Sequence, residues 1–269
     1  MKYEACVMRI EGTNCEEESK RALIEIGIPA EIVNLKQLTH ECKEERHRNL
    51  EDYRMVYLPG GWSAGDYVRA GAIFAARLKS KLGKELRDYV DSGKLVLGVC
   101  NGFQILIELG MLPGFSGMSR YPEAMLAINK NTRFQCRPTY LKHVGKCKLT
   151  SKITVGKVLQ IPVAHGEGRL TFGNKNAEML KRLRKNDQIV FRYCRNDGKE
   201  AKDEFPWNPN GSLYDIAGIC NPEKNVLGMM PHPERVMHAY QQADWTRTSY
   251  ITGIGRGVFE SIAAHLGKN

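Results

Sequence analysis

The sequence predicts an α/β protein: a three-layer α/β/α sandwich with a mostly parallel central sheet, plus an additional β-rich region. Two observations support this class. Up to Pro113, short segments that are apolar on both faces alternate with amphipathic helical segments, and such strands are typical of parallel sheets that helices cover on both sides. After Pro113 the helical rhythm gives way to runs rich in β-branched and aromatic residues.

The parallel part is expected to begin with a strand and a helix. EACVMRI (4–10) is the first strand, and GTNCEEESKRALIEIG (12–27) is a loop followed by a helix that starts with acidic residues and stops at Gly27. The same alternation then continues. Its members are the strand AEIVNL (30–35), the strand YRMVYLPGG (53–61), the helical region 66–93 and the strand KLVLGVC (94–100).

The β-rich part covers roughly residues 115–228, where β-leaning runs are joined by polar loops. These runs are RFQCRPTYLKHV (133–144), KVLQIPVAHGEGRLTF (157–172) and QIVFRYC (188–194). Residues 195–213 form the most loop-like stretch, and residues 216–235 predict a hairpin with two apolar arms around NPEKN. A closing helix is expected from about Trp245 to Leu266. Without a repeat or a linker, residues 1–269 are expected to form a single domain.

Composition is that of an ordinary globular protein of the cytoplasm. A chain of 269 residues that is 42% hydrophobic can bury a substantial core. Its N-terminus carries Lys2, Glu4 and Arg9, and no apolar run approaches the roughly 20 residues that a membrane helix needs. The eight cysteines are expected to be reduced, and none stands at C-x-x-C spacing. We therefore expect a cytoplasmic location, no membrane partner and no metal site.

The formal charge of +10 is the one unusual bulk property. Because the Lys and Arg residues are dispersed, a solvated basic surface is the favoured interpretation, ahead of an acidic protein partner. No helix-turn-helix, RNP or zinc-finger pattern is present. No nucleic-acid partner is expected.

Cys100 stands where a buried strand ends and a helix begins. Gly98, Cys100 and Gly102 match the G-x-C-x-G spacing of a nucleophile elbow, in which small neighbours allow a tight turn from strand to helix. The helix start directs free N–H groups at the thiol, which favours a thiolate. The alternative is a buried structural thiol, since free cysteine is among the most buried residue types.

His232 is the candidate base for that nucleophile. It lies between Pro231 and Pro233, which favour extended backbone, so His232 and Glu234 can point to the same side. A carboxylate beside an imidazole fixes its tautomer, and this completes a Cys-His-acid arrangement. The alternative is a His-Pro-Glu loop without a catalytic role.

Two further features fit the same site. Gly60 and Gly61 end the third strand, where one backbone N–H can point at a developing oxyanion together with the N–H of Asn101. Gln104 follows Cys100 on the same helix face and can reach a group that acylates the thiol. The alternatives are an ordinary turn and a solvent-facing glutamine.

Four segments together carry a family resemblance: LPGGWSAGDYVRAGAIFAA, GVCNGFQILIELGMLPG, VAHGEGR and NPNGSLYDIAGICNPEKNVLGMMPHPER. In this order, and over nearly the whole chain, they resemble the glutamine amidotransferase subunits of phosphoribosylformylglycinamidine synthase, which are class I triad amidotransferases of purine biosynthesis. The Cys-Asn-Gly-Phe-Gln elbow, the Gly-Asp-Tyr-x-Arg-Ala-Gly segment and the Asn-Pro-Asn-Gly-Ser stretch are specific to this subunit. The resemblance implies a class I amidotransferase-like sandwich with flavodoxin-like topology.

The resemblance also implies a reaction and its site. Cys100 would attack the side-chain amide of L-glutamine, and His232, oriented by Glu234, would pass the proton to the departing ammonia. Gly61 and Asn101 would form the oxyanion hole. The glutamine pocket would be lined by Gly60, Gln104, His165, Gly166 and Glu167.

The family's partners follow from the same resemblance. Ammonia would pass to a synthetase subunit that uses ATP and Mg to convert formylglycinamide ribonucleotide to the amidine, and a small third subunit would join the complex. This chain has no G-x-x-x-x-G-K-[ST] sequence. No cofactor is expected in the chain itself.

The chain departs from the family pattern at three places. Glu11 stands where many members have proline, Ala164 where related enzymes often have asparagine, and residues 195–207 add polar length. Two other functions are considered: another Cys-triad γ-glutamyl hydrolase, and a noncatalytic binding protein. The remaining cysteines are interpreted as structural: Cys6, Cys15, Cys42, Cys136, Cys147, Cys194 and Cys220.

Overall fold

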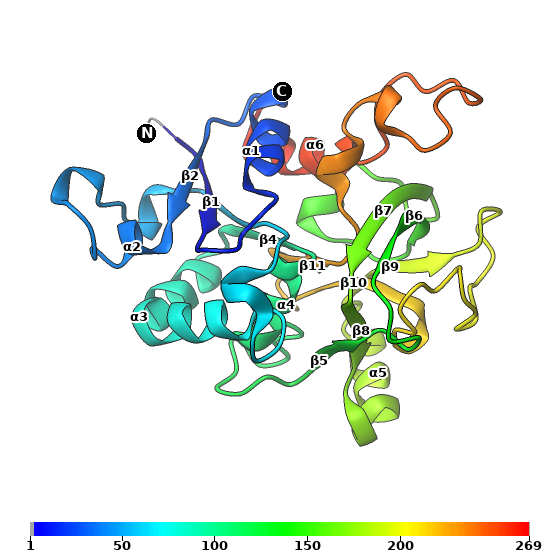
Figure 1. Ribbon diagram of the computed structural model, residues 1–269, viewed down its shortest axis with the longest axis horizontal. Coiled ribbons are helices and arrows are strands. Elements are labelled where there is room, and N and C mark those ends of the chain that lie inside the picture. Colours follow the sequence, from blue (N-terminus) through cyan, green and yellow to red (C-terminus); the bar gives the residue numbers. More distant parts are fainter. Residues whose placement is uncertain (1–2, 269) are drawn as a thin grey trace.

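One large mixed sheet forms the centre of the computed structural model, which describes residues 3–268 (Figure 1). Within these residues it has nine strands in the order β2-β1-β3-β4-β11-β10-β9-β6-β7. The first five run parallel, and β10, β9, β6 and β7 continue the sheet antiparallel. The predicted class, with its mostly parallel sheet and β-rich addition, is confirmed.

The strands of the large sheet lie within the predicted runs, whereas β5 was not predicted, and the predicted run 157–172 divides into β7 and β8. A separate antiparallel pair is formed by β5 (Met125–Ile128) and β8 (Glu167–Thr171). The strands of the large sheet are β1 (Ala5–Arg9), β2 (Ala30–Asn34), β3 (Met55–Leu58), β4 (Leu95–Val99), β6 (Gln135–His143), β7 (Val158–His165), β9 (Ile189–Cys194), β10 (Ile216–Cys220) and β11 (Val226–Met229).

Helices cover the parallel part of the sheet on both faces (Figure 1). The helices α1 and α6 contact each other on one face, and α3 and α4 contact each other on the opposite face. The helices are α1 (Glu16–Glu25), α2 (Leu35–Leu38), α3 (Ala72–Asp91), α4 (Asn101–Glu108), α5 (Asn176–Lys185) and α6 (Arg256–His265).

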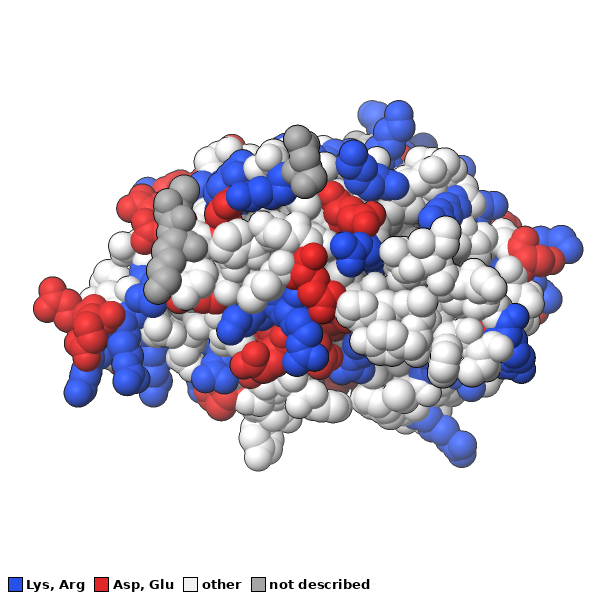
Figure 2. Space-filling model, turned by 90° about the horizontal axis from the view of Figure 1, so that it is seen from above, with Lys and Arg blue, Asp and Glu red and all other residues white. Residues whose placement is uncertain are grey.

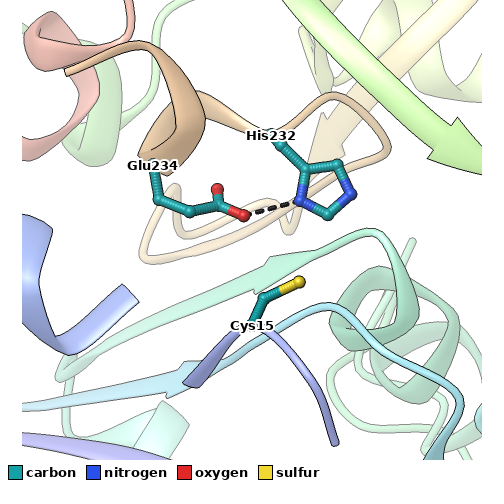
Figure 3. Close-up of side chains that lie close together, drawn as sticks. All are labelled: Cys15, His232 and Glu234. Atoms are coloured by element: carbon teal, nitrogen blue, oxygen red, sulfur yellow. Dashed lines mark hydrogen bonds and ion pairs between the residues drawn. The ribbon is translucent and has the colours of Figure 1, made fainter. Parts of the chain in front are cut away.

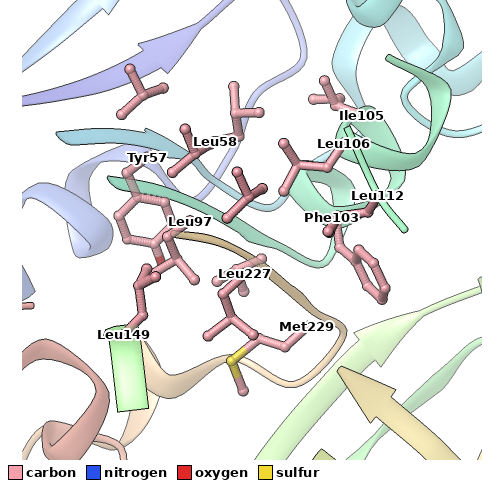
Figure 4. Packing of buried hydrophobic residues seen from close by; sticks show 14 of the residues in the cluster. Tyr57, Leu58, Leu97, Phe103, Ile105, Leu106, Leu112, Leu149, Leu227 and Met229 are labelled. Atoms are coloured by element: carbon pink, nitrogen blue, oxygen red, sulfur yellow. The ribbon is translucent and has the colours of Figure 1, made fainter. Parts of the chain in front are cut away.

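Buried hydrophobic side chains pack around the central parallel strands (Figure 4). All five residues of β4 are buried, as are all four of β3 and β11. Phe103 and Leu106 of α4 pack beside Leu97 and Leu227. Because each such side chain contributes roughly 1.5–3 kcal/mol when buried, this cluster holds the ends of β4 and β11 firmly in place.

Two predicted helices begin later than the sequence indicates. The helical region predicted from residue 66 starts at Ala72, because Asp66 and Gly71 have φ angles of 51° and 77°. The closing helix predicted from Trp245 starts at Arg256. A Cβ on Gly253 would lie 2.1 Å from the Val236 carbonyl oxygen. The backbone at Gly253 therefore packs against the backbone at Val236 and does not form the predicted helix.

The helix α5 was not predicted, because residues 115–228 were expected to contain strands and polar loops. Its apolar residues Met179 and Leu183 are buried one turn apart, and its last turn carries Arg182, Arg184 and Lys185. The sequence does contain apolar residues at helical spacing here, but the pattern is short and basic residues surround it. The hairpin predicted for residues 216–235 is confirmed by antiparallel pairing of β10 with β11.

Basic residues are spread rather than gathered on the face of the molecule seen in Figure 2. In the face that Figure 2 shows, Lys and Arg side chains are interspersed with Asp and Glu. This distribution agrees with the solvated basic surface that the sequence favours. Among the described residues, the helices are all too short or too polar to cross a membrane.

Candidate active site

Cys100 occupies a sharp turn between β4 and α4. Its φ of 53° and ψ of −108° lie outside the helical and strand regions. Two glycines make the turn possible: a Cβ on Gly98 would lie 2.5 Å from Leu106 Cδ1, and a Cβ on Gly102 would lie 1.8 Å from the Leu58 carbonyl oxygen. The Cys100 N–H donates to the Met229 carbonyl oxygen at 2.8 Å. The G-x-C-x-G spacing therefore corresponds to a real backbone requirement.

Gly102→Ala is expected to lower the free energy of unfolding by more than about 4 kcal/mol, or to prevent folding. The added methyl group would overlap the backbone of β3, which cannot move without disrupting the core. Denaturant unfolding measures the change. Gly83→Ala in α3 is the matched control, because the nearest atom to its new Cβ is Lys79 Cγ at 3.8 Å; that variant should gain roughly 0.5–1 kcal/mol. Equal stability of the two variants would contradict the elbow packing.

His232 and Glu234 form a buried pair beside this turn. The Nδ1 atom of His232 lies 2.6 Å from Oε1 of Glu234. Tyr57, on β3, donates its hydroxyl proton to the other carboxylate oxygen at 3.3 Å. The N–H of His232 donates to the Pro162 carbonyl oxygen on β7 at 2.8 Å. The pair is thus held between two strands of the sheet, and its carboxylate fixes the orientation of the imidazole.

The other ring nitrogen of His232, Nε2, lies on the side of the ring away from Glu234 (Figure 3). Nε2 is buried and has no hydrogen-bond partner among the described residues. Burial alone would lower the pKa of His232, but the Glu234 carboxylate and the adjacent Cys100 hold that pKa well above its ordinary value. A Cβ on Gly60 would lie 2.7 Å from His232 Cε1 and 3.4 Å from Cys100 Cβ. Gly60 therefore lies next to both the proposed nucleophile and the proposed base, and the absence of a side chain at residue 60 leaves room for them.

Asn101, the residue after Cys100, anchors a network of polar side chains. Its Oδ1 accepts from the Ser63 hydroxyl at 2.6 Å, and its Nδ2 donates to Gln104 Oε1 at 2.9 Å and to Asp66 Oδ1 at 3.3 Å. Gln104 in turn donates to the Glu167 carbonyl oxygen. Both ends of the Gln104 amide are thus occupied by protein groups. The network ties the elbow to the loop after β3 and to β8.

Glu167 and Gly61 are held by backbone contacts. The Ala70 N–H donates to Glu167 Oε2 at 3.1 Å. Gly61 has a φ of 148°, and a Cβ there would lie 2.7 Å from the Asn14 nitrogen. The loop after β1 therefore packs directly on the Pro-Gly-Gly turn.

Asp66 is a partly buried carboxyl whose ionisation opposes folding. Burial, followed by the neighbouring charge of Glu167, raises the pKa of Asp66 to about 6. Because the folded pKa exceeds the unfolded value of about 3.9, the stabilising contribution is complete below pH ~4 and is lost as the pH rises through about 6. The melting temperature of wild type relative to Asp66→Asn is therefore expected to fall across this interval. Asp244→Asn should show no trend across this interval, because hydrogen bonding from Tyr250 lowers the pKa of Asp244, and its stabilising contribution is complete above pH ~4 and is lost only as the pH falls below that value.

His165 is placed away from solvent between two asparagines. Its Nδ1 lies 3.2 Å from Asn129 Oδ1, and its Nε2 lies 3.5 Å from Asn210 Nδ2. Burial, with a smaller effect of the His232 charge, lowers the pKa of His165 to about 3. This imidazole is neutral at physiological pH. Its neighbour Gly166 follows the end of β7, near Phe134.

The Asn-Pro-Asn-Gly-Ser stretch is hydrogen-bonded to β8, the strand that follows β7. Ser212 Oγ donates to the Gly168 carbonyl oxygen at 3.1 Å and accepts from the Leu170 N–H at 3.0 Å. Asn208 Oδ1 accepts from the N–H groups of Gly211 and Ser212 at 2.9 and 3.2 Å. The role of this motif in the described structure is to shape the wall that contains His165.

Several site residues were not singled out by the sequence. Ser63, Asp66 and Asn129 act through side-chain hydrogen bonds to elements distant in the chain, so no local pattern indicates them. Cys15 was interpreted as structural, yet its thiol lies beside His232 and Glu234 (Figure 3). The only sequence signal was its place in the loop between β1 and α1, at an edge where a parallel sheet gathers functional groups.

The chain is similar to known proteins over most of its length. Residues 2–264 match the family described as CobB/CobQ-like glutamine amidotransferase domain. The phosphoribosylformylglycinamidine synthase subunit PurQ of Archaeoglobus fulgidus is 46% identical over 98% of this chain and 97% of its own. The subunit of the same name from Thermus thermophilus is 42% identical over 86% and 88%. A chain in the structure of PurLQS from Thermotoga maritima has a TM-score of 0.73 and 32% identity, covering 99% of this chain and 100% of that one.

Proposed function

We propose that this chain, which belongs to the family of CobB/CobQ-like glutamine amidotransferase domains, hydrolyses glutamine with a triad of Cys100, His232 and Glu234. The chain is the glutaminase subunit of a phosphoribosylformylglycinamidine synthase, an ATP-dependent ligase complex of purine biosynthesis. One observation supports the triad above all others. The buried Nε2 of His232 has no partner among the described residues, while Nδ1 is bonded to Glu234.

The proposed reaction begins with transfer of the Cys100 proton to His232 Nε2. The thiolate attacks the side-chain carbonyl carbon of glutamine, and the N–H groups of Gly61 and Asn101 stabilise the oxyanion. His232 then gives its proton to the departing nitrogen, which leaves as ammonia, and a γ-glutamyl thioester remains on Cys100. Water, activated by the same imidazole, hydrolyses the thioester to glutamate and the free thiol.

The glutamine pocket is proposed to lie between the elbow and the β7–β8 segment. Gly60, Gln104, His165, Gly166 and Glu167 are its proposed lining. Hydrogen bonds from Gln104 to Glu167 and from Ala70 to Glu167 support a pre-formed wall there. Since His165 is buried against two asparagines, its contribution is to hold the backbone of this wall.

The ammonia is proposed to pass to a synthetase subunit that uses ATP and Mg, with a small third subunit in the same complex. A cytoplasmic location, a single domain and the lack of a cofactor in this chain remain predictions. The similarity to PurQ relatives extends over most of the chain. It favours neither of the two alternative functions, another γ-glutamyl hydrolase or a noncatalytic binding protein.

An electrophilic analogue of glutamine tests the nucleophile. Incubation with 6-diazo-5-oxo-L-norleucine, followed by peptide mapping, is expected to find the label on Cys100, and excess glutamine should slow the labelling. Because the chain carries eight cysteines, labelling of Cys100 alone would distinguish it from the other seven thiols. Uniform labelling of several thiols, or labelling that glutamine does not affect, would contradict the proposal.

A further inference from the structure

A second thiol lies beside the His232–Glu234 pair. Cys15 is in the loop between β1 and α1, and the close-up shows its sulfur directed toward the imidazole (Figure 3). One ligand atom each from Cys15, His232 and Glu234 all lie within 4.8 Å of one another. All three residues are buried, with exposed fractions of 2%, 1% and 3%. The reaction described above uses His232 and Glu234 but leaves Cys15 without a role.

The position of Cys15 is fixed by the turn after β3. The N–H groups of Asn14 and Cys15 both donate to the Gly60 carbonyl oxygen, at 3.2 and 3.1 Å. A Cβ on Gly60 would lie 3.1 Å from the Cys15 sulfur and 2.7 Å from His232 Cε1. The space beside the thiol is therefore open only because residue 60 is glycine. On its far side the sulfur accepts a hydrogen bond from Arg235 Nη2 at 3.1 Å.

We propose that Cys15, His232 and Glu234 form an inhibitory binding site for a thiophilic divalent cation such as Zn²⁺. The inhibition, but not the binding, rests on the proposed glutaminase function. A thiolate, an imidazole nitrogen and a carboxylate oxygen are the three donor types that zinc takes in proteins, with water completing the tetrahedron. Here the nitrogen is Nδ1 of His232, which already lies 2.6 Å from Oε1 of Glu234, so two of the three donors are adjacent before any ion binds.

Binding requires small movements of the side chains. A tetrahedral zinc ion with bonds of about 2.1 Å keeps neighbouring nitrogen and oxygen ligands about 3.4 Å apart, whereas Nδ1 and Oε1 are now 2.6 Å apart. The Glu234 carboxylate must therefore retreat by roughly 1 Å. The Arg235 guanidinium is also paired with Glu18 at 2.9 Å, which offsets its repulsion of a cation. Its hydrogen bond to sulfur would stabilise the bound thiolate.

The cation would stop catalysis by displacing a proton. Binding at Nδ1 requires the lone pair of that nitrogen, so the single proton of the neutral ring moves from Nδ1 to Nε2, and the Cys15 thiol releases its proton to water. The ring then carries its only proton on Nε2. In that tautomer Nε2 has no lone pair to accept the proton of Cys100, so the nucleophile cannot be activated.

Binding is tested first without activity, in the full-length Cys100→Ala protein. Zn²⁺ affinity is measured by competition with a chromophoric chelator, and Co²⁺ is added separately to look for a thiolate-to-cobalt charge-transfer band in the near ultraviolet. We expect one zinc equivalent and a thiolate band. Adding Cys15→Ser should weaken zinc binding by more than about 100-fold, since losing even an outer partner of a ligand costs 10–100-fold. Cys136→Ser, which removes an exposed thiol, is the matched control and should change nothing.

Two results would overturn the site. Loss of zinc binding on Cys100→Ala alone would make Cys100 a required ligand, and unchanged affinity on Cys15→Ser would exclude Cys15. The Co²⁺ spectrum requires no change at Cys15, so misfolding of that variant cannot hide the answer. Because the binding measurement needs no catalysis, its failure is distinguishable from failure of the glutaminase function.

Inhibition is tested second, by glutamate release with the synthetase partner present. Zn²⁺ should inhibit the unsubstituted chain reversibly, with activity restored by a chelator. The half-inhibiting concentration, normalised to each protein's own uninhibited rate, should rise by more than about 100-fold in Cys15→Ser and stay unchanged in Cys136→Ser. Equal inhibition of all three proteins would overturn the inhibitory role.

Discussion

Cys100→Ala is expected to reduce glutamine hydrolysis on the order of 10⁶-fold, the scale of loss when a triad nucleophile is removed. Alanine has no atom that can form the thioester, and the remaining pair of His232 and Glu234 can only activate water. Glutamate release is measured for wild type and variant, each with and without the synthetase, ATP, Mg and the third subunit. The turn itself should survive, because the residues that require glycine at this elbow are Gly98 and Gly102.

Cys136→Ala provides the control for this prediction. Cys136 is an exposed free thiol on β6, so its removal tests for general effects of losing a cysteine. Its activity should equal that of wild type within about twofold, a shift of less than about 0.5 kcal/mol. If Cys100→Ala and wild type hydrolysed glutamine alike under every condition, Cys100 would be only a packing residue.

Glu234→Gln is expected to lower kcat on the order of 10⁴-fold, the loss known for amidation of a triad carboxylate. The size and packing of the side chain are kept, but the amide can donate to His232 Nδ1, which then places the imidazole proton on Nε2. The proton acceptor for Cys100 is lost. Removing the carboxylate charge also removes the main cause that raises the pKa of His232 against burial. The pH profile of glutamate release measures both effects.

Tyr57→Phe separates the role of this carboxylate from that of its surroundings. The Tyr57 hydroxyl bonds the oxygen of Glu234 that does not face the imidazole. Its loss leaves the 2.6 Å contact between His232 and Glu234 in place. We expect kcat to fall about tenfold, which corresponds to roughly 1.4 kcal/mol, the free energy of one hydrogen bond. If Glu234→Gln lost no more activity than Tyr57→Phe, the carboxylate would not be orienting a catalytic base.

Most of the fold was predictable because its signals are local. The strands β1, β3 and β4 are apolar runs because nearly all of their residues are buried, and the hairpin of β10 and β11 was indicated by its turn residues. The exceptions have physical causes. The helix α5 shows only two buried apolar residues, and the start of α6 depends on the close approach of Gly253 to the backbone of Val236.

The sequence by itself determined the elements, the elbow at Cys100 and the pairing of His232 with Glu234, because these depend on backbone conformation and on residues two to four apart. Only the tertiary structure decided which distant groups meet. It brought Cys15 and Gly60 to His232, joined Asn101 to Ser63 and Asp66, and buried His165 between Asn129 and Asn210. Such contacts arise where the ends of separate strands converge at one edge of a sheet, and spacing along the chain carries no record of that convergence.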